Sequence, residues 1–175
     1  MSRFRAALAS HKILIADGAT GTTLQKAGLP PGTAPERWNL ENQDAVRALH
    51  RGYIEAGADM VLTNTFGGTS VRLKREDLAE RAAEINRAAA ALAREVAGES
   101  VLVVGDIGPT GEMMAPLGTL THEEAVASFA QQAGALAEGG VDAILIETMS
   151  DLAEVQAAVE GVRQVTDLPL MVTMS

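Results

Sequence analysis

Five short runs of aliphatic and β-branched residues recur along the chain without regular alternation of apolar and polar positions. They cover Ile13–Ala16, Met60–Thr63, Val101–Val104, Ala143–Ile146 and Leu170–Thr173. Continuous runs of this length are typical of strands that are buried on both faces of a parallel sheet. We therefore predict five parallel strands.

The segments between these runs have the spacing of amphipathic helices, with apolar residues at steps of three and four. They predict helices from about Asp44 to Ala56, over 76–97, after Thr121 and from about Ser150. The third helix has a capping box, because Glu124 stands three residues after Thr121. A strand followed by a helix, repeated four times, is the pattern of βαβ units. No linker divides the chain, so we expect a single α/β unit.

Polar residues follow four of the apolar runs, namely Asp17, Asn64, Asp106 and Glu147. The carboxyl ends of parallel strands form the face on which binding sites are built. A carboxylate there can reach a ligand while its strand stays buried. Any one of these residues could instead be a helix cap or a turn former. Three carboxylates and an asparagine at equivalent places favour a site.

Three glycine- and threonine-rich loops follow the first three runs, at 17–23, 63–69 and 105–111. The first loop lacks the lysine of a P-loop and the G-x-G spacing of a dinucleotide fold, so it does not indicate phosphate binding. Together the loops indicate a pocket for a small polar molecule, with Phe66 as the large apolar group of the second loop. The alternative is that the glycines only form tight turns.

Composition narrows the class of protein. The chain has 175 residues, of which 47% are hydrophobic and 21% charged, as in globular proteins. The net charge of −9 and the lack of a basic cluster argue against a nucleic-acid or membrane surface. No apolar stretch approaches the roughly 18 residues of a membrane span, and the first residues lack a signal-peptide pattern. We expect a cytoplasmic protein.

Metal ligands are scarce. There is no cysteine, which excludes disulfides and thiolate metal sites within these residues. His11, His50 and His122 share no ligand spacing, and we expect them to be surface or partly buried side chains.

Trp38 lies in the long connection between the first run and the first predicted helix. It could cover the pocket or anchor that connection, and the sequence leaves this open.

The loops resemble the homocysteine S-methyltransferase family, most closely the N-terminal homocysteine-binding domain of cobalamin-dependent methionine synthase. The matching stretches run in order through almost the whole chain. They are IADGATGT (15–22), E-x-W-N-L (36–40), ADMVLTNTFGG (58–68), GDIGPTGE with PLG (105–118) and AILIETMSD (143–151).

The resemblance implies a (β/α)₈ TIM barrel, of which this chain supplies the first five strands and four helices. Residues 1–175 would then be the N-terminal part of a single homocysteine-binding domain. The implied activity is methyl transfer to homocysteine to give methionine, with a zinc ion that deprotonates the substrate thiol because the thiolate is the nucleophile.

The resemblance also implies roles for residues of this chain. Asp17 and Gly18 match contacts of the first loop with the substrate. Phe66 matches a residue on the sulfur side, and Glu147 matches the carboxylate for the substrate ammonium. Asn64 and Asp106 rest mainly on their strand-end positions.

The family's zinc ligands are cysteines, which this chain lacks. The resemblance therefore implies a segment that carries part of the substrate site without the metal ligands, and we expect the chain alone to be inactive. The expected partners are homocysteine and a methyl donor, together with cobalamin- or folate-binding domains or self-association. Methylcobalamin is the donor that the similar loops favour, while S-methylmethionine and betaine serve other relatives.

Two other interpretations stay open. The chain could belong to another (β/α)-barrel enzyme, such as a corrinoid-linked methyltransferase for a different thiol or an aldolase. It could also be a non-catalytic partial barrel that pairs with another chain through its open strand edge.

Overall fold

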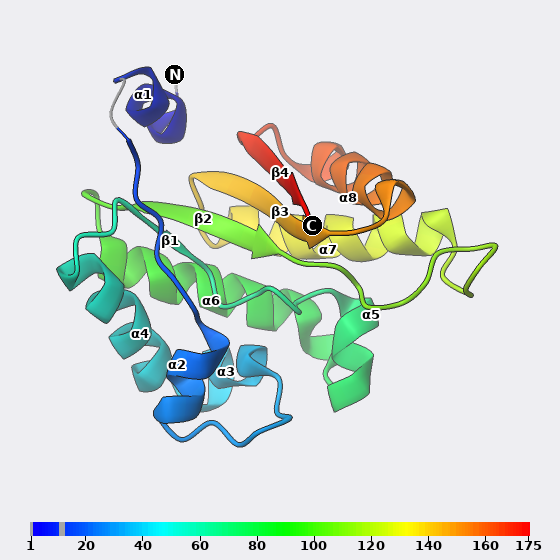
Figure 1. Cartoon of the computed structure of the whole chain (residues 1–175), viewed down its shortest axis with the longest axis horizontal. Coiled ribbons are helices and arrows are strands. Elements are labelled where there is room, and N and C mark those ends of the chain that lie inside the picture. The colour runs from blue at the N-terminus through cyan, green and yellow to red at the C-terminus, as the bar shows by residue number, and fades with distance from the viewer. Residues whose placement is uncertain (1, 11–12) are drawn as a thin grey trace.

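Four parallel strands form the centre of the fold (Figure 1). The computed structural model describes residues 2–10 and 13–175. The strands are β1 (Met60–Leu62), β2 (Leu102–Ile107), β3 (Ala143–Met149) and β4 (Leu170–Met174), and they lie side by side in this order. Each neighbouring pair is parallel. Parallel neighbours need a crossover connection, and a helix supplies each one.

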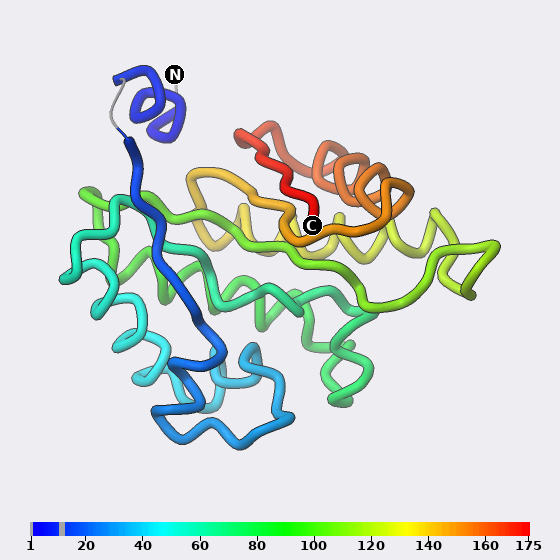
Figure 2. Tube along the Cα trace, viewed as in Figure 1, coloured from blue at the N-terminus to red at the C-terminus, as the bar shows by residue number. Residues whose placement is uncertain are grey.

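The helices that follow β1, β2 and β3 cover one face of this sheet, as the trace in Figure 2 also shows. They are α6 (Ala82–Ala97), α7 (His122–Glu138) and α8 (Leu152–Val165). Before β1 come α1 (Arg3–Ala9), α2 (Gly21–Lys26), α3 (Trp38–Glu41) and α4 (Gln43–Glu55), and the short α5 (Ser70–Leu73) follows β1. Short 3₁₀ turns cover Pro35–Arg37, Lys74–Glu76 and Ala79–Arg81. Strand-helix repeats in sequential order confirm the predicted α/β class and match part of a (β/α)₈ barrel.

The starts of two helices were predicted from the sequence, and the structure confirms one of them. The predicted capping box is present, because Thr121 and Glu124 each accept a hydrogen bond from the other's backbone. The helix predicted over 76–97 begins only at Ala82. Asp77 has a left-handed backbone (φ 58°) between two 3₁₀ turns, and this conformation interrupts a helix.

The two central strands β2 and β3 are mostly buried on both faces, whereas the edge strand β4 is half-buried to exposed, so the predicted burial was wrong for Leu170–Thr173. On the helix side Val61, Val103 and Ile144 are at most 1% exposed and belong to the main core. On the other side Leu102, Val104 and Ala143 pack with Phe4 of α1. Both faces are therefore apolar, which explains why the runs are continuous.

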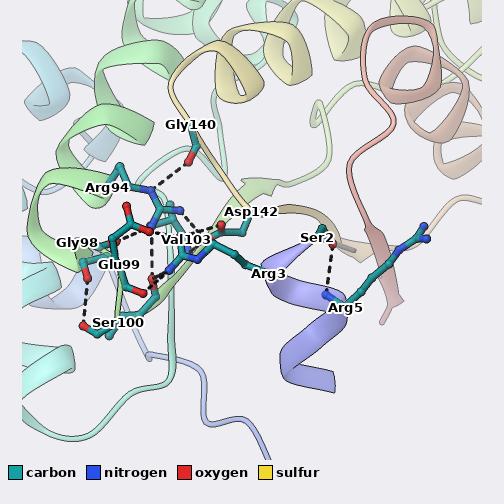
Figure 3. Close-up of polar contacts among 12 residues, drawn as sticks. Ser2, Arg3, Arg5, Arg94, Gly98, Glu99, Ser100, Val103, Gly140 and Asp142 are labelled. Atoms are coloured by element: carbon teal, nitrogen blue, oxygen red, sulfur yellow. Dashed lines mark hydrogen bonds and ion pairs between the residues drawn. The ribbon is translucent and has the colours of Figure 1, made fainter. Parts of the chain in front are cut away.

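Helix α1 lies at the end of the sheet where the strands begin (Figure 1). Arg3 of α1 donates to Oδ1 of Asp142 at 3.1 Å, and Arg94 of α6 donates to Oδ2 of the same carboxylate. Figure 3 shows the two arginines converging on Asp142, which also accepts the backbone N–H of Val103 at 2.8 Å. Together with buried Phe4, these contacts fix α1 to the sheet.

The predicted first strand, Ile13–Ala16, is absent, so the prediction of five strands was wrong by this one. Only Ala16 pairs with Met60, in an isolated parallel bridge. The carboxylate of Asp59 accepts the backbone N–H of Ile15 at 3.0 Å, and among the described residues the remaining backbone hydrogen bonds of this segment join only Ile15 and Asp17 to Asp59 and Met60. The segment therefore runs beside β1 without forming a ladder, and Ile13 and Ile15 are exposed.

The structure places His50, His122 and Trp38. His50 of α4 is fully buried, so the expectation of a surface or partly buried side chain was wrong for this residue. His122 is exposed and pairs with Glu160, while His11 lies outside the described residues. Trp38 packs against a cluster of Leu24, Leu29 and Leu49, so it anchors its connection to the body. In the part of the chain that the structure describes, no helix has both the length and the apolarity to cross a membrane.

Candidate functional site

A cavity of about 600 Å³ opens at the carboxyl ends of β1, β2 and β3. Five of the six predicted site residues line it, namely Gly18, Asn64, Phe66, Asp106 and Glu147. They come from loops and strands that are far apart in sequence, and the parallel sheet brings them together. Asp17 is not among the lining residues, but it directly precedes Gly18 in the sequence.

Asp17 links the first segment to β1. Its Oδ2 accepts the backbone N–H of Leu62 at 3.0 Å, and its buried Oδ1 has no hydrogen-bond partner among the described residues. Burial raises the pKa of Asp17 to about 7, and the negative charge of Glu147 adds to this rise. Burial therefore favours the protonated form of this carboxyl group more than in an exposed aspartate.

Asp106 is a buried acidic side chain at the cavity, with 6% of its surface exposed. Its backbone N–H donates to Oγ1 of Thr63 at 3.0 Å, but its carboxyl Oδ1 has no partner among the described residues. Burial raises the pKa of Asp106 well above its usual value, and the charges of Glu147, Glu36 and Asp17 raise it further. A positive ligand group would offset this electrostatic cost.

Glu147 lies in a β-bulge of β3. The register with β4 shifts between Ile146 and Met149, and Thr148 has a φ of 60°. The sequence predicted that the strand ends before Glu147, whereas it continues to Met149 through this irregularity. Bulges re-aim side chains and are frequent beside active sites. Burial raises the pKa of the half-buried Glu147 as well, so three carboxyl groups of raised pKa share one end of the sheet.

Asn64 fastens the chain around the cavity. Its Nδ2 donates to the carbonyl of Pro35 at 2.8 Å and to Oδ1 of Asn39 at 3.0 Å. Asn39 in turn donates from Nδ2 to the carbonyl of Asn64 at 2.8 Å. An amide has two N–H donors, so Asn64 can offer a ligand only its oxygen. Its main contribution is to hold the segment that contains the 3₁₀ turn Pro35–Arg37.

The first glycine-rich loop rests on α4. Tyr53 donates from its hydroxyl to the carbonyl of Ala19 at 2.9 Å. A Cβ atom at Gly18 would lie 3.2 Å from the same hydroxyl oxygen. Glycine therefore lets the loop approach α4 closely while its exposed backbone faces the cavity.

Glu36 and Arg72 also line the cavity, although the sequence analysis did not name them as site residues. Glu36, 4% exposed, accepts the backbone N–H of Gly67 on Oε1 at 2.6 Å. Burial raises its pKa, while the charge of Arg72 opposes that rise. The guanidinium of Arg72 lies over the ring of Phe66, 5.5 Å from its centroid. The only sequence signal was the position of Glu36 in the stretch E-x-W-N-L.

The residues present do not fit the zinc ion that the resemblance implies. The chain has no cysteine, and residues 2–10 and 13–175 contain no group of three potential side-chain ligands arranged to hold a metal. The cavity can bind a cationic group at its carboxyl groups and can hold protons on them.

Comparison with known proteins supports a relationship over almost the whole chain. Methionine synthase of Mycobacterium tuberculosis is 36% identical over 167 residues, and that of Mycobacterium leprae is 34% identical. Each alignment covers 89% of this chain but only 14% of the relative. The chain thus spans a small part of the length of these curated relatives.

Solved structures show the same fold. The metallated form of the homocysteine methyltransferase MmuM from Escherichia coli superposes with a TM-score of 0.83 at 24% sequence identity. The superposition covers 95% of this chain and 64% of MmuM. The sequence model of one family, described as Homocysteine S-methyltransferase, matches residues 14–175. The chain therefore belongs to the homocysteine S-methyltransferase family.

Proposed function

We propose that the cavity binds homocysteine and that the chain acts within a homocysteine S-methyltransferase, in which the substrate sulfur accepts a methyl group to give methionine. Residues 1–175 would form the N-terminal part of a single homocysteine-binding domain. Membership of the family supports this proposal. The observation that carries it is the buried carboxyl group of Asp106 at a cavity shared with Glu147, because its Oδ1 has no hydrogen-bond partner within residues 2–10 and 13–175.

The substrate ammonium would bind at this acidic end of the cavity. Carboxyl groups that raise one another's pKa when empty become stable as anions once a cation lies among them. A charge-assisted hydrogen bond to an ammonium would then use the free oxygens of Asp106 and Asp17 and the half-buried carboxylate of Glu147. The oxygen of Asn64 would accept a further hydrogen bond from the ammonium, and Gly18 would contact the rest of the amino-acid end, with Phe66 beside the sulfur.

In the proposed reaction the thiolate sulfur attacks the methyl carbon, a sulfur–carbon bond forms and the bond from the methyl group to its donor breaks. The residues of this chain bind and orient the amino acid for that attack. The likeness to two methionine synthases supports methylcobalamin as the donor, carried by a further cobalamin- or folate-binding domain. A cytoplasmic location is part of the same proposal.

The test is calorimetric titration of L-homocysteine into the 175-residue chain and into Glu147→Gln. We expect the chain to bind, and Glu147→Gln to bind at least about tenfold more weakly, because a hydrogen bond to a charged group contributes about 1.5–3 kcal/mol. The matched control is Glu123→Gln, an exposed residue at the start of α7. It should bind as the unmodified chain does.

A substrate analogue sharpens the assignment. 4-Mercaptobutyrate keeps the thiol and the carboxylate of homocysteine but lacks its ammonium, so it should bind much more weakly. If the analogue and homocysteine bind equally, or if Glu147→Gln leaves the affinity for homocysteine unchanged, the acidic groups do not bind the ammonium. If homocysteine does not bind at all, the proposed function of this chain is wrong.

A further inference from the structure

The cavity contains a second polar region of opposite charge. Its volume of about 600 Å³ lies within the roughly 300–1,000 Å³ of pockets that hold drug-sized ligands. A small amino acid at the acidic groups would leave part of this space unfilled. The remaining lining includes the arginines Arg72 and Arg75, in a chain with a net charge of −9.

Arg72 is held in place but keeps most of its donors. Its backbone N–H bonds to Oγ1 of Thr69 at 3.2 Å, within α5. Its guanidinium lies over the ring of Phe66 and donates from Nη1 to the carbonyl of Pro109 at 3.3 Å. A guanidinium has five N–H donors, so most remain for a ligand. A fixed fork of this kind binds carboxylate or phosphate with little loss of freedom.

No carboxylate neutralises Arg72 directly. Among the residues that the structure describes, it forms no ion pair within 4.0 Å, whereas Arg75 pairs with Glu112 at 2.8 Å. Glu36, whose pKa Arg72 lowers, already accepts the N–H of Gly67. Arg75 adds positive charge nearby, since a Cβ at Gly111 would lie 3.3–3.4 Å from the nitrogens of both arginines. Arg72 is therefore the group with free hydrogen-bonding capacity on this wall.

The two charged regions come from different elements of the fold, and Glu36 is electrostatically coupled to both. The charges that act on Asp106 come from Glu147, Glu36 and Asp17, while Arg72 acts on Glu36. Asp106 and Glu147 belong to β2 and β3, whereas Arg72 belongs to the short helix after β1. Phe66 lies against Arg72 and lines the same cavity. The cavity can thus hold two ligands, or two ends of a reacting pair, with opposite charges.

We propose that Arg72 binds an anionic oxygen group, a carboxylate or a phosphate, of the second substrate, which is the methyl donor or its carrier. This proposal rests on the proposed function for the identity of the first ligand. The anion would place the second substrate beside Phe66, over whose ring the guanidinium of Arg72 lies. Arg72 would then determine which donors the cavity accepts.

The test uses simple anions as probes. Inorganic phosphate and succinate are titrated separately into the 175-residue chain, with and without saturating homocysteine. We expect one of them to bind, and to bind as well or better when homocysteine is present. Preference for phosphate would indicate a phosphate-bearing donor, and preference for succinate a carboxylate-bearing donor. Absence of binding by both anions, or competition of the anion with homocysteine, would overturn the proposal.

Variants locate the bound anion. Arg72→Gln should weaken anion binding at least about tenfold and change homocysteine affinity less than about twofold, as for loss of one charged hydrogen-bond donor. Arg72→Lys, which keeps the charge, should retain part of the anion affinity. Arg51→Gln is the matched control, because Arg51 is exposed on α4 and forms no side-chain hydrogen bond or ion pair within residues 2–10 and 13–175. Circular dichroism of each variant checks its fold.

The outcomes separate the two proposals. If Arg72→Gln leaves anion binding intact, or weakens homocysteine binding as strongly as anion binding, Arg72 only supports Phe66 and the inference is wrong. If homocysteine does not bind but the anion binds and depends on Arg72, the proposed function fails while the anion site stands.

Discussion

Thr110 and Glu154 are joined by two hydrogen bonds that end on one carboxylate oxygen. The backbone N–H of Thr110 donates to Oε1 of Glu154 at 2.8 Å, and its hydroxyl group donates to the same atom at 2.6 Å. Both residues are buried. Glu154 lies in the first turn of α8, where a negative charge is favoured by the helix dipole. The pair fastens the glycine-rich loop after β2 to the helix after β3.

Replacing Thr110 by valine keeps the shape of the side chain and removes the hydroxyl donor. We expect the free energy of unfolding to fall by about 1.5–3 kcal/mol, as for loss of a hydrogen bond to a buried charged group. Urea denaturation followed by circular dichroism measures this. The exposed Thr119→Val is the matched control and should stay within about 0.5 kcal/mol of the unmodified chain. Equal stability of both variants would show that the hydroxyl contact contributes nothing.

His50 should make the fold sensitive to acid. Burial lowers the pKa of His50 from 6.5 to about 4, and neither ring nitrogen has a partner among the described residues. In the unfolded chain His50 binds a proton below about pH 6.5, whereas in the folded chain it binds one only below about pH 4. The free energy of unfolding therefore decreases as the pH falls through this window. The loss attributable to His50 is of the order of 3 kcal/mol.

Replacing His50 by leucine should therefore flatten the decline in unfolding free energy between pH 6.5 and pH 4. The exposed His122 is the matched control for substitution, as His122→Leu. Parallel pH profiles for His50→Leu and the unmodified chain would contradict the expectation.

Asp17 should have the opposite dependence on pH. Its pKa rises from 3.8 to about 7 on folding, so the folded chain keeps a proton that the unfolded chain has released. The contribution of Asp17 to stability therefore falls as the pH rises from about 4 to about 7. Asp17→Asn should remove this part of the fall and be at least as stable as the unmodified chain at pH 8. The hydrogen bond from Leu62 survives, because the asparagine oxygen accepts it.

The measurement is urea denaturation at pH 5 and pH 8 for both proteins. Because Asp106 and Glu147 also have raised pKa values, part of the dependence on pH will remain in Asp17→Asn. A large loss of stability of Asp17→Asn at pH 8 would mean that its carboxylate is needed for the fold and is not an electrostatic cost.

Arg3 should control the docking of α1. Arg3→Gln removes its ion pair with Asp142 and its hydrogen bond to the carbonyl of Glu99 at 2.7 Å. We expect the amides of α1 to exchange with deuterium faster, while those of α8 are unchanged. Arg5→Gln is the control from the same helix, because the side chain of Arg5 points away from the cluster in Figure 3. Equal exchange in all three proteins would mean that Phe4 alone holds the helix.

Much of the fold could be predicted from the sequence because the apolar runs lie where strands are buried on both faces. The run Ala143–Ile146 became β3, and the Thr121 capping box starts α7 as expected. The run Ile13–Ala16 has the same composition, but the carboxylate of Asp59 takes its backbone N–H. Whether a backbone N–H bonds to a side chain or to a neighbouring strand depends on the tertiary structure. The spacing of apolar residues in the sequence carries no information about this choice.

The candidate site was predicted in part. Strand-end positions and the family resemblance named five residues that line the cavity, but Glu36 and Arg72 emerged only from the structure. Glu36 reaches the cavity because Asn64 and Asn39 fasten its loop over the end of β1. The burial of His50 follows from a helix face that it shares with Val46, although the histidine itself suggested the surface.

The anchoring of α1 has a practical consequence for work on this chain. Asp142 stands just before β3, and Glu147 stands near its other end. Contacts that secure the scaffold and groups that face the ligand cavity are thus separated along the length of the strands. Libraries that randomise the cavity loops could therefore leave Asp142 and α1 untouched. Docking of α1 and ligand selectivity could then be improved in successive rounds.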